Sequence, residues 1–504
     1  MHALLSYLYH FEAQKFEKAL GNCEKVQRIM LQQILLTNNQ SPWGQSQGLA
    51  KIKNYSDFTD HFPVTEYMDW HKVILQDKTN GVGHLNRTVT RYEATSGSTG
   101  ARKWIPYTPL FLSEINRAAQ TWIHDLYKSY PAVKSGKHFW SLSWIPDDLR
   151  KDQDSDDLNL FPWWQIPLLK KFMVMHPAIQ NAPTSESAWH ATKLLLCSTE
   201  DLTLLSVWSP SYALNLIYEI FRDRVQIAAM LKTKSWGIFS SELAAHTPCT
   251  RANFPSECAD LETFVQMLWP KLVLISCWRA GPSSGLAAEL ADIFKKVSIQ
   301  GKGLWATEGV VTFPWKDKYP LAIRSHFFEF RCLQTEKIFP AWELQMHQEV
   351  QPLITSSNGI LRYALPDRIK VTEFFKQTPC FEFLGRMDGV DLVGEKVAYA
   401  TASQIIVELN LQFPEAKITC LAASVSDAKA QYWVIGLGNL ETAATIAYAA
   451  EEKLLKLHHY RIARELHQIL PVKTQLFGDS LSQAQFLTRA EIKGQSKINS
   501  IIRI

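Results

Sequence analysis

The chain has 504 residues, of which 46% are hydrophobic and 20% are charged. This composition is typical of a folded globular protein and excludes a disordered one. The formal net charge is only +4 and Lys and Arg form no dense block, which argues against a nucleic-acid-binding protein. At roughly 100–200 residues per domain, the length predicts two to four folding units.

The N-terminal apolar run is soon interrupted by Glu12 and Lys15, unlike a secretory signal. No stretch reaches the roughly 18 apolar residues that would span a bilayer. The eight cysteines include no C-x-x-C pair, so neither a zinc site nor a disulfide framework is indicated. We therefore expect a reduced, cytoplasmic protein that does not enter a membrane.

Apolar residues at helical spacing predict helical structure over residues 1–40, ended by a cluster of Asn, Ser, Pro and Gly. Thr108 and Pro109 then predict the N-cap and first position of a helix that runs to about residue 127. Short apolar runs alternate with helical patterns in the following part of the chain, which favours an α/β architecture. These runs are 139–144, 204–208, 272–278 and 303–306.

The C-terminal part has a pattern of its own, which predicts a small α+β domain. We expect helices at 400–413 and 440–457, and strands at 418–426, 431–437 and 472–477. The segment GRMDG at 385–389 is the expected boundary. The predicted domains are therefore residues 1–387 and residues 388–504.

The strongest local signal is the segment from Tyr92 to Lys103, which reads YEATSGSTGARK. Its central six residues are Thr95, Ser96, Gly97, Ser98, Thr99 and Gly100. Glycines let several backbone N–H groups point at one anion, hydroxyls add donors, and Lys103 adds a positive charge. The pattern predicts a phosphate-binding loop, although composition alone also fits a hydroxyl-rich surface turn. Its glycine spacing differs from that of a P-loop and from G-x-G-x-x-G.

This segment resembles the phosphate loop of the acyl-adenylate-forming enzymes, roughly [ST]-S-G-[ST]-[TS]-G-x-x-K. Pro106, three residues after Lys103, is similar to the auxin-responsive acyl-acid amido synthetase branch. General acyl-CoA ligases usually have Pro directly before the Lys, where this chain has Arg102. The resemblance covers the whole chain and implies a large N-terminal acyl-adenylating domain with a mobile C-terminal domain.

The segment LWATEG at 304–309 is similar to the second motif of that family. A flat ring such as Trp305 can stack on adenine beside Ala306, and Thr307 can bind a phosphate. Glu308 offers a hard oxygen ligand for Mg²⁺. The family more often has Tyr than Trp at this point. Taken alone, the segment also fits a strand end with an isolated surface glutamate.

Two further segments resemble family motifs. LRYALPD at 361–367 is similar to R-Y-x-x-G-D, which implies that Asp367 binds the ribose hydroxyls; Pro366 stands where Gly is usual. GRMD at 385–388 is similar to the G-R-x-D hinge, which implies that Arg386 binds ribose or phosphate and that Asp388 is the pivot.

In this family a lysine of the small domain swings over the phosphates during adenylation. Lys497 in KGQSKI, residues 493–498, matches it by position, and Lys493 is the alternative. The resemblance thus implies catalytic roles for Lys497, Lys103 and Glu308.

Candidates for the acyl pocket follow from side-chain chemistry. Arg117 lies on the helix after the phosphate loop, where it offers a cation to a substrate carboxylate. Trp144, Trp208 and Tyr212 offer flat walls, and Gly281 lies where the superfamily packs small-residue backbone against adenine. Each of them also fits a place in the core or at the surface.

The implied reaction uses ATP and Mg²⁺ to convert a small carboxylic acid into an acyl-AMP with release of pyrophosphate. An amine, typically an amino acid, then displaces AMP and an amide results. We expect a monomer or a weak dimer with no nucleic-acid partner. The alternatives are an acyl-CoA or carrier-protein ligase that uses the same adenylate, and a non-catalytic ATP-binding member of the fold.

Overall fold

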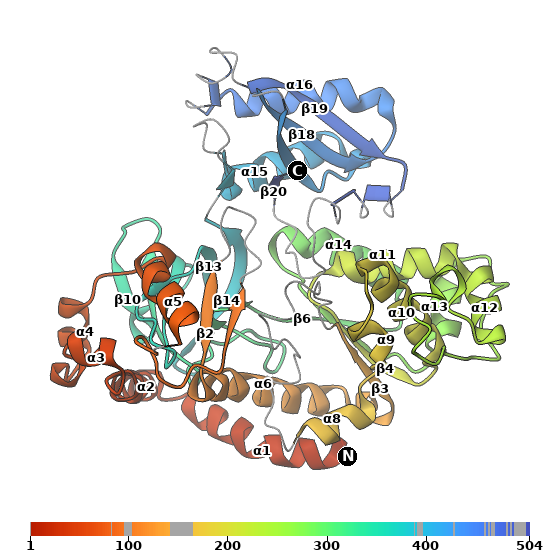
Figure 1. Cartoon of the computed structure of the whole chain (residues 1–504). Helices are drawn as coiled ribbons and strands as arrows, with labels where there is room; N and C mark the ends of the chain where they lie inside the picture. The colour runs from red at the N-terminus through yellow and green to blue at the C-terminus, as the bar shows by residue number, and fades with distance from the viewer. Residues whose placement is uncertain are drawn as a thin grey trace.

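The computed structural model describes residues 2–81, 83–94, 103–141, 165–387, 389–390, 397–426, 429–457, 460–461, 464, 469–479, 482–483, 486–487 and 500–503. These residues form a large mixed α/β part and a smaller β-rich C-terminal part (Figure 1). The expected fold class, a large N-terminal α/β domain with a small α+β one, is confirmed.

The helical N-terminal segment is two helices, α1 (His2–Ala19) and α2 (Cys23–Asn38). The predicted break after residue 38 is present, because Ser41 caps the next helix by accepting a hydrogen bond from Gly44 N at 2.9 Å. The short helices that follow are α3 (Pro42–Ser46), α4 (Tyr55–His61) and α5 (Tyr67–Asn80).

Helix α6 (Pro109–Ser129) follows the hairpin of β1 (Arg91–Ala94) and β2 (Trp104–Tyr107). Its predicted N-cap is confirmed, because Thr108 Oγ1 accepts a hydrogen bond from Phe111 N at 3.1 Å. In Figure 1, α6 runs below both halves of the large part and packs along α1. It therefore connects the strand hairpin to the two sheets described next.

The first sheet has four parallel strands in the order β3-β4-β5-β6. The strands are β3 (Lys137–Trp140), β4 (Leu202–Ser206), β5 (Leu274–Cys277) and β6 (Ser298–Gly301). Helices α8 (Ile166–Phe172), α9 (Pro177–Gln180), α10 (Ser185–Ser198), α11 (Pro210–Arg222), α12 (Arg224–Thr233), α13 (Leu261–Leu268) and α14 (Ser284–Ile293) belong to this half. The alternation of strands and helices was predicted correctly.

The last expected strand of this sheet was misplaced by a few residues. The sheet strand is β6, whereas Trp305–Ala306 forms the two-residue strand β7, which pairs with β8 (Gly309–Val310). The reason lies at Gly303, which has φ +77° and where a Cβ would lie 2.5 Å from Thr312 O. The chain therefore turns out of the sheet before residue 305.

The second sheet is antiparallel, in the order β10-β9-β11-β13-β14 with β12 beside β11. Its strands are β9 (Phe327–Cys332), β10 (Ile338–Pro340), β11 (Glu349–Thr355), β12 (Tyr363–Ala364), β13 (Asp367–Phe375) and β14 (Thr378–Arg386). It packs on α2 in the large core cluster, with Phe327, Phe328 and Phe330 fully buried.

The C-terminal part has a hydrophobic cluster of its own, which includes Leu409, Tyr432 and Ile446. A short hairpin, β15 (Gly389–Val390) with β16 (Val397–Ala398), leads into it. The predicted helices and strands are confirmed as α15 (Tyr399–Gln412), β17 (Cys420–Ser426), β18 (Lys429–Leu437), α16 (Ala443–Leu454) and β19 (Ile469–Phe477). A strand that was not predicted, β20 (Ile501–Arg503), pairs with β17.

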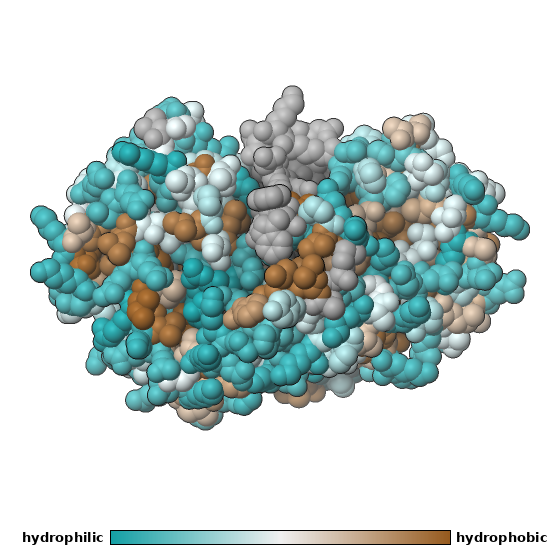
Figure 2. All heavy atoms as spheres, turned by 90° about the horizontal axis from the view of Figure 1, so that it is seen from below, coloured by the Kyte–Doolittle hydropathy of each residue, from teal (hydrophilic) through white to brown (hydrophobic). Residues whose placement is uncertain are grey.

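Hydrophilic residues cover most of the face that Figure 2 shows, with hydrophobic patches between them. Among the described residues, no helix combines the length and apolar character needed to cross a bilayer. All eight cysteines are described, and each is a free thiol.

Candidate active site

Three charged residues that the sequence placed in separate motifs act electrostatically on Glu308. Glu308 ends the turn between β7 and β8, and the charges that act on it are Asp367, Arg386 and Lys103. Burial is the main reason that the pKa of Glu308 is raised; Asp367 raises it further, while Arg386 and Lys103 lower it. The fold thus collects acids and bases from segments that are far apart in the chain.

Two of these charges come from adjacent strands of the antiparallel sheet. Asp367, the first residue of β13, is the register partner of Arg386, the last residue of β14. Asp367 is buried. The turn before it contains Pro366 in place of the usual glycine, and Pro366 O accepts a hydrogen bond from Met387 N at 2.8 Å. The proline is therefore accommodated without loss of the link between the two strand ends.

Tyrosine hydroxyls position the backbone around Glu308. Tyr363 Oη donates to Glu308 Oε1 at 3.4 Å, and Tyr107 Oη donates to the carbonyl of Thr307 at 3.0 Å. Tyr67 Oη accepts from Trp104 N at 2.8 Å, and Lys103 Nζ lies 5.7 Å from the centroid of the Tyr67 ring. Of these tyrosines only Tyr363 lies in a motif that sequence analysis had singled out.

A buried polar chain connects α6 to the β7–β8 hairpin. His326 Nδ1 lies 3.0 Å from Glu114 Oε2, and His326 Nε2 accepts a hydrogen bond from Val310 N at 3.2 Å. Ser357 Oγ donates to the other oxygen of Glu114. Glu114 lies on the helix that follows the phosphate-loop segment. These hydrogen bonds therefore connect that helix to the strand next to Glu308. The sequence carried no signal for it.

Tryptophans surround the expected adenine motif. Trp305 Nε1 donates to Lys302 O at 2.9 Å, and the Trp305 ring lies 5.9 Å from that of Trp122 and 6.4 Å from that of Trp208. The Trp208 ring in turn lies 5.8 Å from Trp278. Trp305 and Trp208, both singled out from the sequence, therefore belong to one aromatic group, to which the fold adds Trp122.

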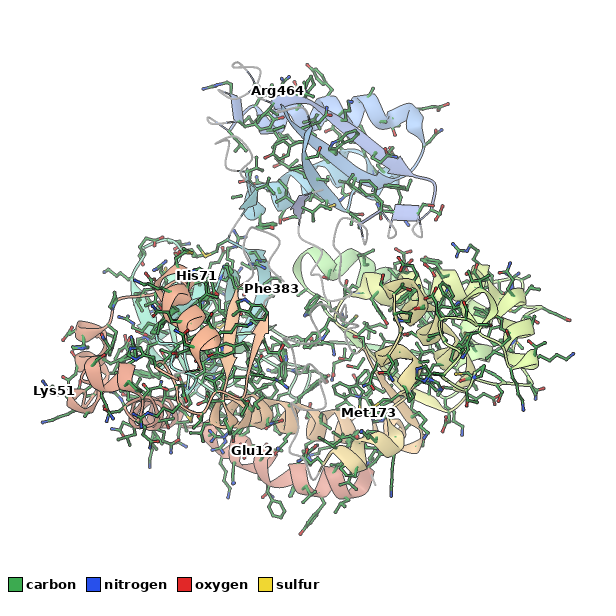
Figure 3. The ribbon with its side chains drawn as sticks, viewed as in Figure 1. Glu12, Lys51, His71, Met173, Phe383 and Arg464 are labelled. Atoms are coloured by element: carbon green, nitrogen blue, oxygen red, sulfur yellow. The ribbon has the colours of Figure 1, made fainter. Side chains whose placement is uncertain are left out.

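Gly281 lies where the two halves of the large part meet. It follows β5, has φ +59°, and a Cβ there would lie 3.2 Å from the Phe383 ring on β14. Figure 3 labels Phe383 near the top of β14, on the side that faces the parallel sheet. A glycine is needed here both for the backbone conformation and for the close approach of the ring.

Two candidates for the acyl pocket, Arg117 and Tyr212, make contacts within the fold. Arg117 Nη1 donates to the carbonyl of Arg324 at 2.9 Å, and the Tyr212 ring packs edge-on at 4.9 Å against Trp189. The remaining candidates, Thr95, Ser96, Gly97, Ser98, Thr99, Gly100, Trp144, Asp388, Lys493 and Lys497, lie outside the described residues. The strands that flank the phosphate-loop segment are described, and Ala94 pairs with Trp104 across the hairpin.

Arg362, inside the third motif, has a structural role. Its guanidinium forms two hydrogen bonds with Glu329, at 2.8 and 2.9 Å, and also donates to the carbonyl of Phe62. Arg362 is buried and has φ +49°, in the left-handed region. This residue therefore fixes the turn before Tyr363, while Asp367 at the end of the motif belongs to the charged cluster.

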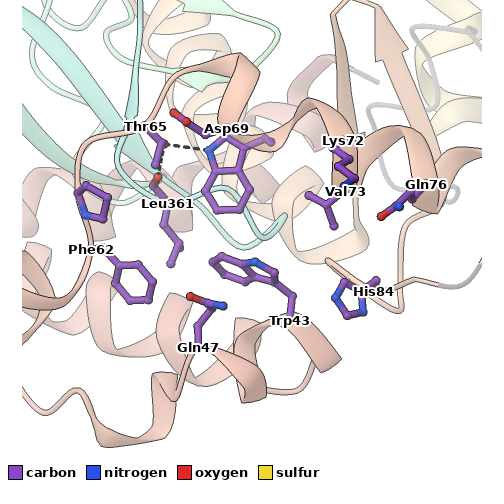
Figure 4. Close-up of a pocket in the computed structure, with 12 residues that line it drawn as sticks. Trp43, Gln47, Phe62, Thr65, Asp69, Lys72, Val73, Gln76, His84 and Leu361 are labelled. Carbon is purple, nitrogen blue, oxygen red and sulfur yellow. Dashed lines mark hydrogen bonds between the residues drawn. The ribbon is translucent and has the colours of Figure 1, made fainter.

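A separate pocket of about 400 Å³ opens between α3, α5 and the segment after α4 (Figure 4). Trp43 and Trp70 form much of its wall, with Leu361 at one side. None of the predicted site residues lines it.

The donor set around Glu308 fits Mg²⁺. Among the described residues, no group of three or more His, Cys, Asp or Glu side chains forms a closed metal cage. Mg²⁺ in nucleotide sites needs only one or two carboxylates, and substrate phosphates and water supply the other ligands. Glu308, with Asp367 in electrostatic range, can provide such an open site.

Comparison with known proteins identifies related folds. Residues 12–299 match the model of the GH3 family N-terminal domain, and residues 319–386 match that of the GH3 family central domain. The structure is similar to "GH3.15 acyl acid amido synthetase", with a TM-score of 0.75, 16% identity, and coverage of 97% of this chain and 92% of the other. It is also similar to "AtGH3.15 acyl acid amido synthetase in complex with 2,4-DB", with a TM-score of 0.76, 15% identity, and coverage of 97% of this chain and 93% of the other. No curated protein matches the sequence significantly.

Proposed function

The chain belongs to the GH3 family, and on this basis we propose that it joins a carboxylic acid to an amine at the expense of ATP. In the first step a carboxylate oxygen attacks the α-phosphorus, the bond to the β-phosphate breaks, and acyl-AMP and pyrophosphate form. In the second step the amine nitrogen attacks the acyl carbon, loses a proton, and AMP leaves. An amino acid is the proposed amine.

The observation that carries the proposal is the convergence of Lys103, Asp367 and Arg386 on Glu308. Adenylation needs cations for the phosphate oxygens and an acceptor for the ribose hydroxyls, held in a fixed geometry. Lys103 and Arg386 supply positive charge, and the buried Asp367 supplies a carboxylate acceptor. Glu308 would hold Mg²⁺, which neutralises phosphate charge when it is bound.

The neighbouring segments complete the proposed nucleotide site. Thr95 to Gly100 would hold the phosphates, since this segment follows β1 and ends three residues before Lys103. Trp305, Ala306 and Thr307 would contact adenine and a phosphate, with Gly281 on the side of the parallel sheet. Lys497 would approach the phosphates from the C-terminal domain as the chain turns about Asp388.

Several finer assignments remain predictions. The domain boundary at 387/388 is one; the match to the central-domain model ends at residue 386. Arg117, Trp144, Trp208 and Tyr212 remain candidates for the acyl pocket. A cytoplasmic location and a monomer or weak dimer are also predictions, and the free thiols agree with a reducing compartment.

ATP–pyrophosphate exchange over a set of aryl, indolyl and aliphatic acids tests the first step. We expect at least one acid class to stimulate exchange, and Glu308→Gln to lower it by roughly 10²–10³-fold. Glu382→Gln is the matched control, because Glu382 is exposed on β14. If no acid stimulates exchange while ATP still binds, the chain is a binding protein and the proposal is wrong.

The acceptor is tested with the acid found in this way. Mass spectrometry of reactions that contain amino acids should detect the amide and AMP. If CoA is added and a thioester forms instead of an amide, the protein is an acyl-CoA ligase. Lys497→Ala should lose exchange far more than ATP affinity, and unchanged exchange would contradict the role of Lys497.

A further inference from the structure

A lysine that sequence analysis did not single out is buried beside the aromatic group. Lys302 directly follows β6 and is only 4% exposed. Its Nζ donates to Ser206 Oγ at 2.7 Å. The same atom lies 4.9, 5.0 and 5.8 Å from the ring centroids of Trp122, Trp208 and Trp140. Three indole rings and one hydroxyl thus surround a cationic group.

No carboxylate of the described residues acts on this ammonium. Among the residues that the structure describes, the only titratable group that acts on Lys302 is the Cys277 thiol, and burial raises the pKa of that thiol to about 12. An ammonium has three N–H donors, of which Ser206 takes one. Cation–π contacts offset part of the cost of burying a charge, but a hydrogen-bonded anion is the usual compensation.

The wall beside Lys302 is a row of side chains across the parallel sheet. One register position in each strand provides it: Trp140 in β3, Ser206 in β4, Ser276 in β5 and Gln300 in β6. Register neighbours point to the same face of a sheet. That face is the one toward α6, because Trp122 Nε1 on α6 donates to Gln300 Oε1 at 3.0 Å.

The row contains an unused polar atom. Ser276 Oγ is fully buried and has no hydrogen-bond partner among the described residues. Buried hydroxyls are normally satisfied. Ser276 is the register partner of Ser206, which the Lys302 ammonium contacts, so its free hydroxyl indicates a place for a ligand group with acceptor oxygens.

The position of Lys302 and its neighbours relative to Glu308 indicates which end of a substrate they would contact. The row lies at the carboxyl ends of the parallel strands, where open α/β sheets bind ligands. The chain links the two regions over a short distance, since Trp305 Nε1 donates to Lys302 O and Glu308 follows Trp305 by three residues. Lys302 is not among the charges that act on Glu308, so it is separate from the atoms that would react.

We propose that Lys302, the hydroxyls of Ser206 and Ser276, and the rings of Trp122, Trp140 and Trp208 form the distal end of the acyl pocket. The substrate they select is a flat aromatic carboxylic acid with a second anionic oxygen group at the end away from the reacting carboxylate. The indoles contact the ring faces, and Lys302 pairs with the second anion. This inference rests on the proposed adenylation function.

Proton uptake on binding tests this assignment independently of turnover. Burial lowers the pKa of Lys302 to about 7, so part of the free protein carries a neutral amine near that pH. An anion that pairs with Lys302 raises this pKa again. Titration calorimetry in buffers of different ionisation enthalpy should therefore show uptake of a fraction of a proton for distal-anionic acids and none for neutral analogues.

The decisive experiment compares matched acids in ATP–pyrophosphate exchange. Phenylacetate and 4-carboxyphenylacetate form one pair, and benzoate and terephthalate form another. Wild-type kcat/KM should be roughly 10-fold or more higher for the dianionic member, as expected for a charged hydrogen bond. Lys302→Met should remove or reverse this preference, Ser206→Ala should reduce it, and the exposed-lysine control Lys296→Met should leave it unchanged.

The outcomes separate the two proposals. Exchange with aryl acids but no preference for the dianion would overturn the role of Lys302 and leave the adenylation function intact. An equal loss for all acids in Lys302→Met would show a structural role only. If Lys302→Met does not fold, Ser206→Ala and the proton uptake decide. If no acid supports exchange, the adenylation function fails and this inference fails with it.

Discussion

Asp367 and Arg386 occupy paired positions at the ends of β13 and β14, and both act on the carboxylate of Glu308. The antiparallel pairing places an acid and a base opposite each other although 18 residues of strand and turn separate them (386 − 367 − 1 = 18). A strand pair is a rigid support, so it would hold the two groups at a fixed spacing in the proposed nucleotide site.

Asp367→Asn should weaken ATP binding. The neutral amide accepts hydrogen bonds less strongly than a carboxylate, and hydrogen bonds to charged groups contribute about 1.5–3 kcal/mol. We expect the dissociation constant of ATP, measured by calorimetry, to rise roughly 10- to 100-fold. Glu382→Gln on the exposed side of β14 is the control. Unchanged affinity in Asp367→Asn would remove Asp367 from the nucleotide site.

The pH dependence of adenylation should show a limb that belongs to Glu308. Burial raises the pKa of this carboxyl above its ordinary value of 4.5. The charged form, which would bind Mg²⁺, is therefore lost at a higher pH than for an exposed glutamate. Exchange rates at saturating ATP should fall as the pH falls through this raised pKa. The weak residual activity of Glu308→Gln should lack that limb, and an identical profile would assign the limb to another group.

His326 should matter for both stability and activity. His326→Phe removes the imidazole partner of the buried Glu114 carboxylate, which keeps its bonds to Ser357, and leaves the N–H of Val310 without its acceptor. A buried polar group that loses its hydrogen-bond partner costs about 1–3 kcal/mol. Denaturant unfolding should show this loss, and exchange should fall because the strand next to Glu308 loses its anchor. Glu114→Gln keeps an acceptor for His326 and should lose much less. Equal losses in both variants would argue that the charge of Glu114, and not the hydrogen-bond chain, matters.

Lys302 should make the protein more stable as the pH rises. Its pKa is about 7 in the folded protein, against an ordinary value of 10.5. Between these values the unfolded chain holds more protons than the folded one, so the free energy of unfolding increases with pH in this window. Below pH 7 the folded protein carries the buried cation and this gain is absent. Thermal unfolding from pH 7 to 10 should show the slope in the wild type and a smaller one in Lys302→Met; equal slopes would contradict the burial of this amine.

The sequence by itself determined the elements and the motifs. Hydrophobic periodicity located α1, α2, α6, α15 and α16 and the strands β17, β18 and β19, because a helix or strand is specified by residues close together in the chain. The same holds for the motif around Glu308 and for Asp367 and Arg386, since each motif is a short continuous segment. Local spacing also led to the one misplaced strand: residues 303–306 are apolar, but Gly303 turns the backbone out of the sheet.

Only the tertiary structure decided which residues meet. The row that runs from Trp140 to Gln300 depends on the register of four parallel strands, and the distance between Glu114 and His326 depends on the packing of α6 against the second sheet. Arg362 lies in the same motif as Asp367, yet its buried pairing with Glu329 gives it a structural role. Register and packing join residues that are remote in sequence, so no local pattern contains them. The chain contains 17 tryptophans, and the fold places three of them, Trp122, Trp140 and Trp208, around the ammonium of Lys302, while Trp305 donates to the carbonyl of the same residue.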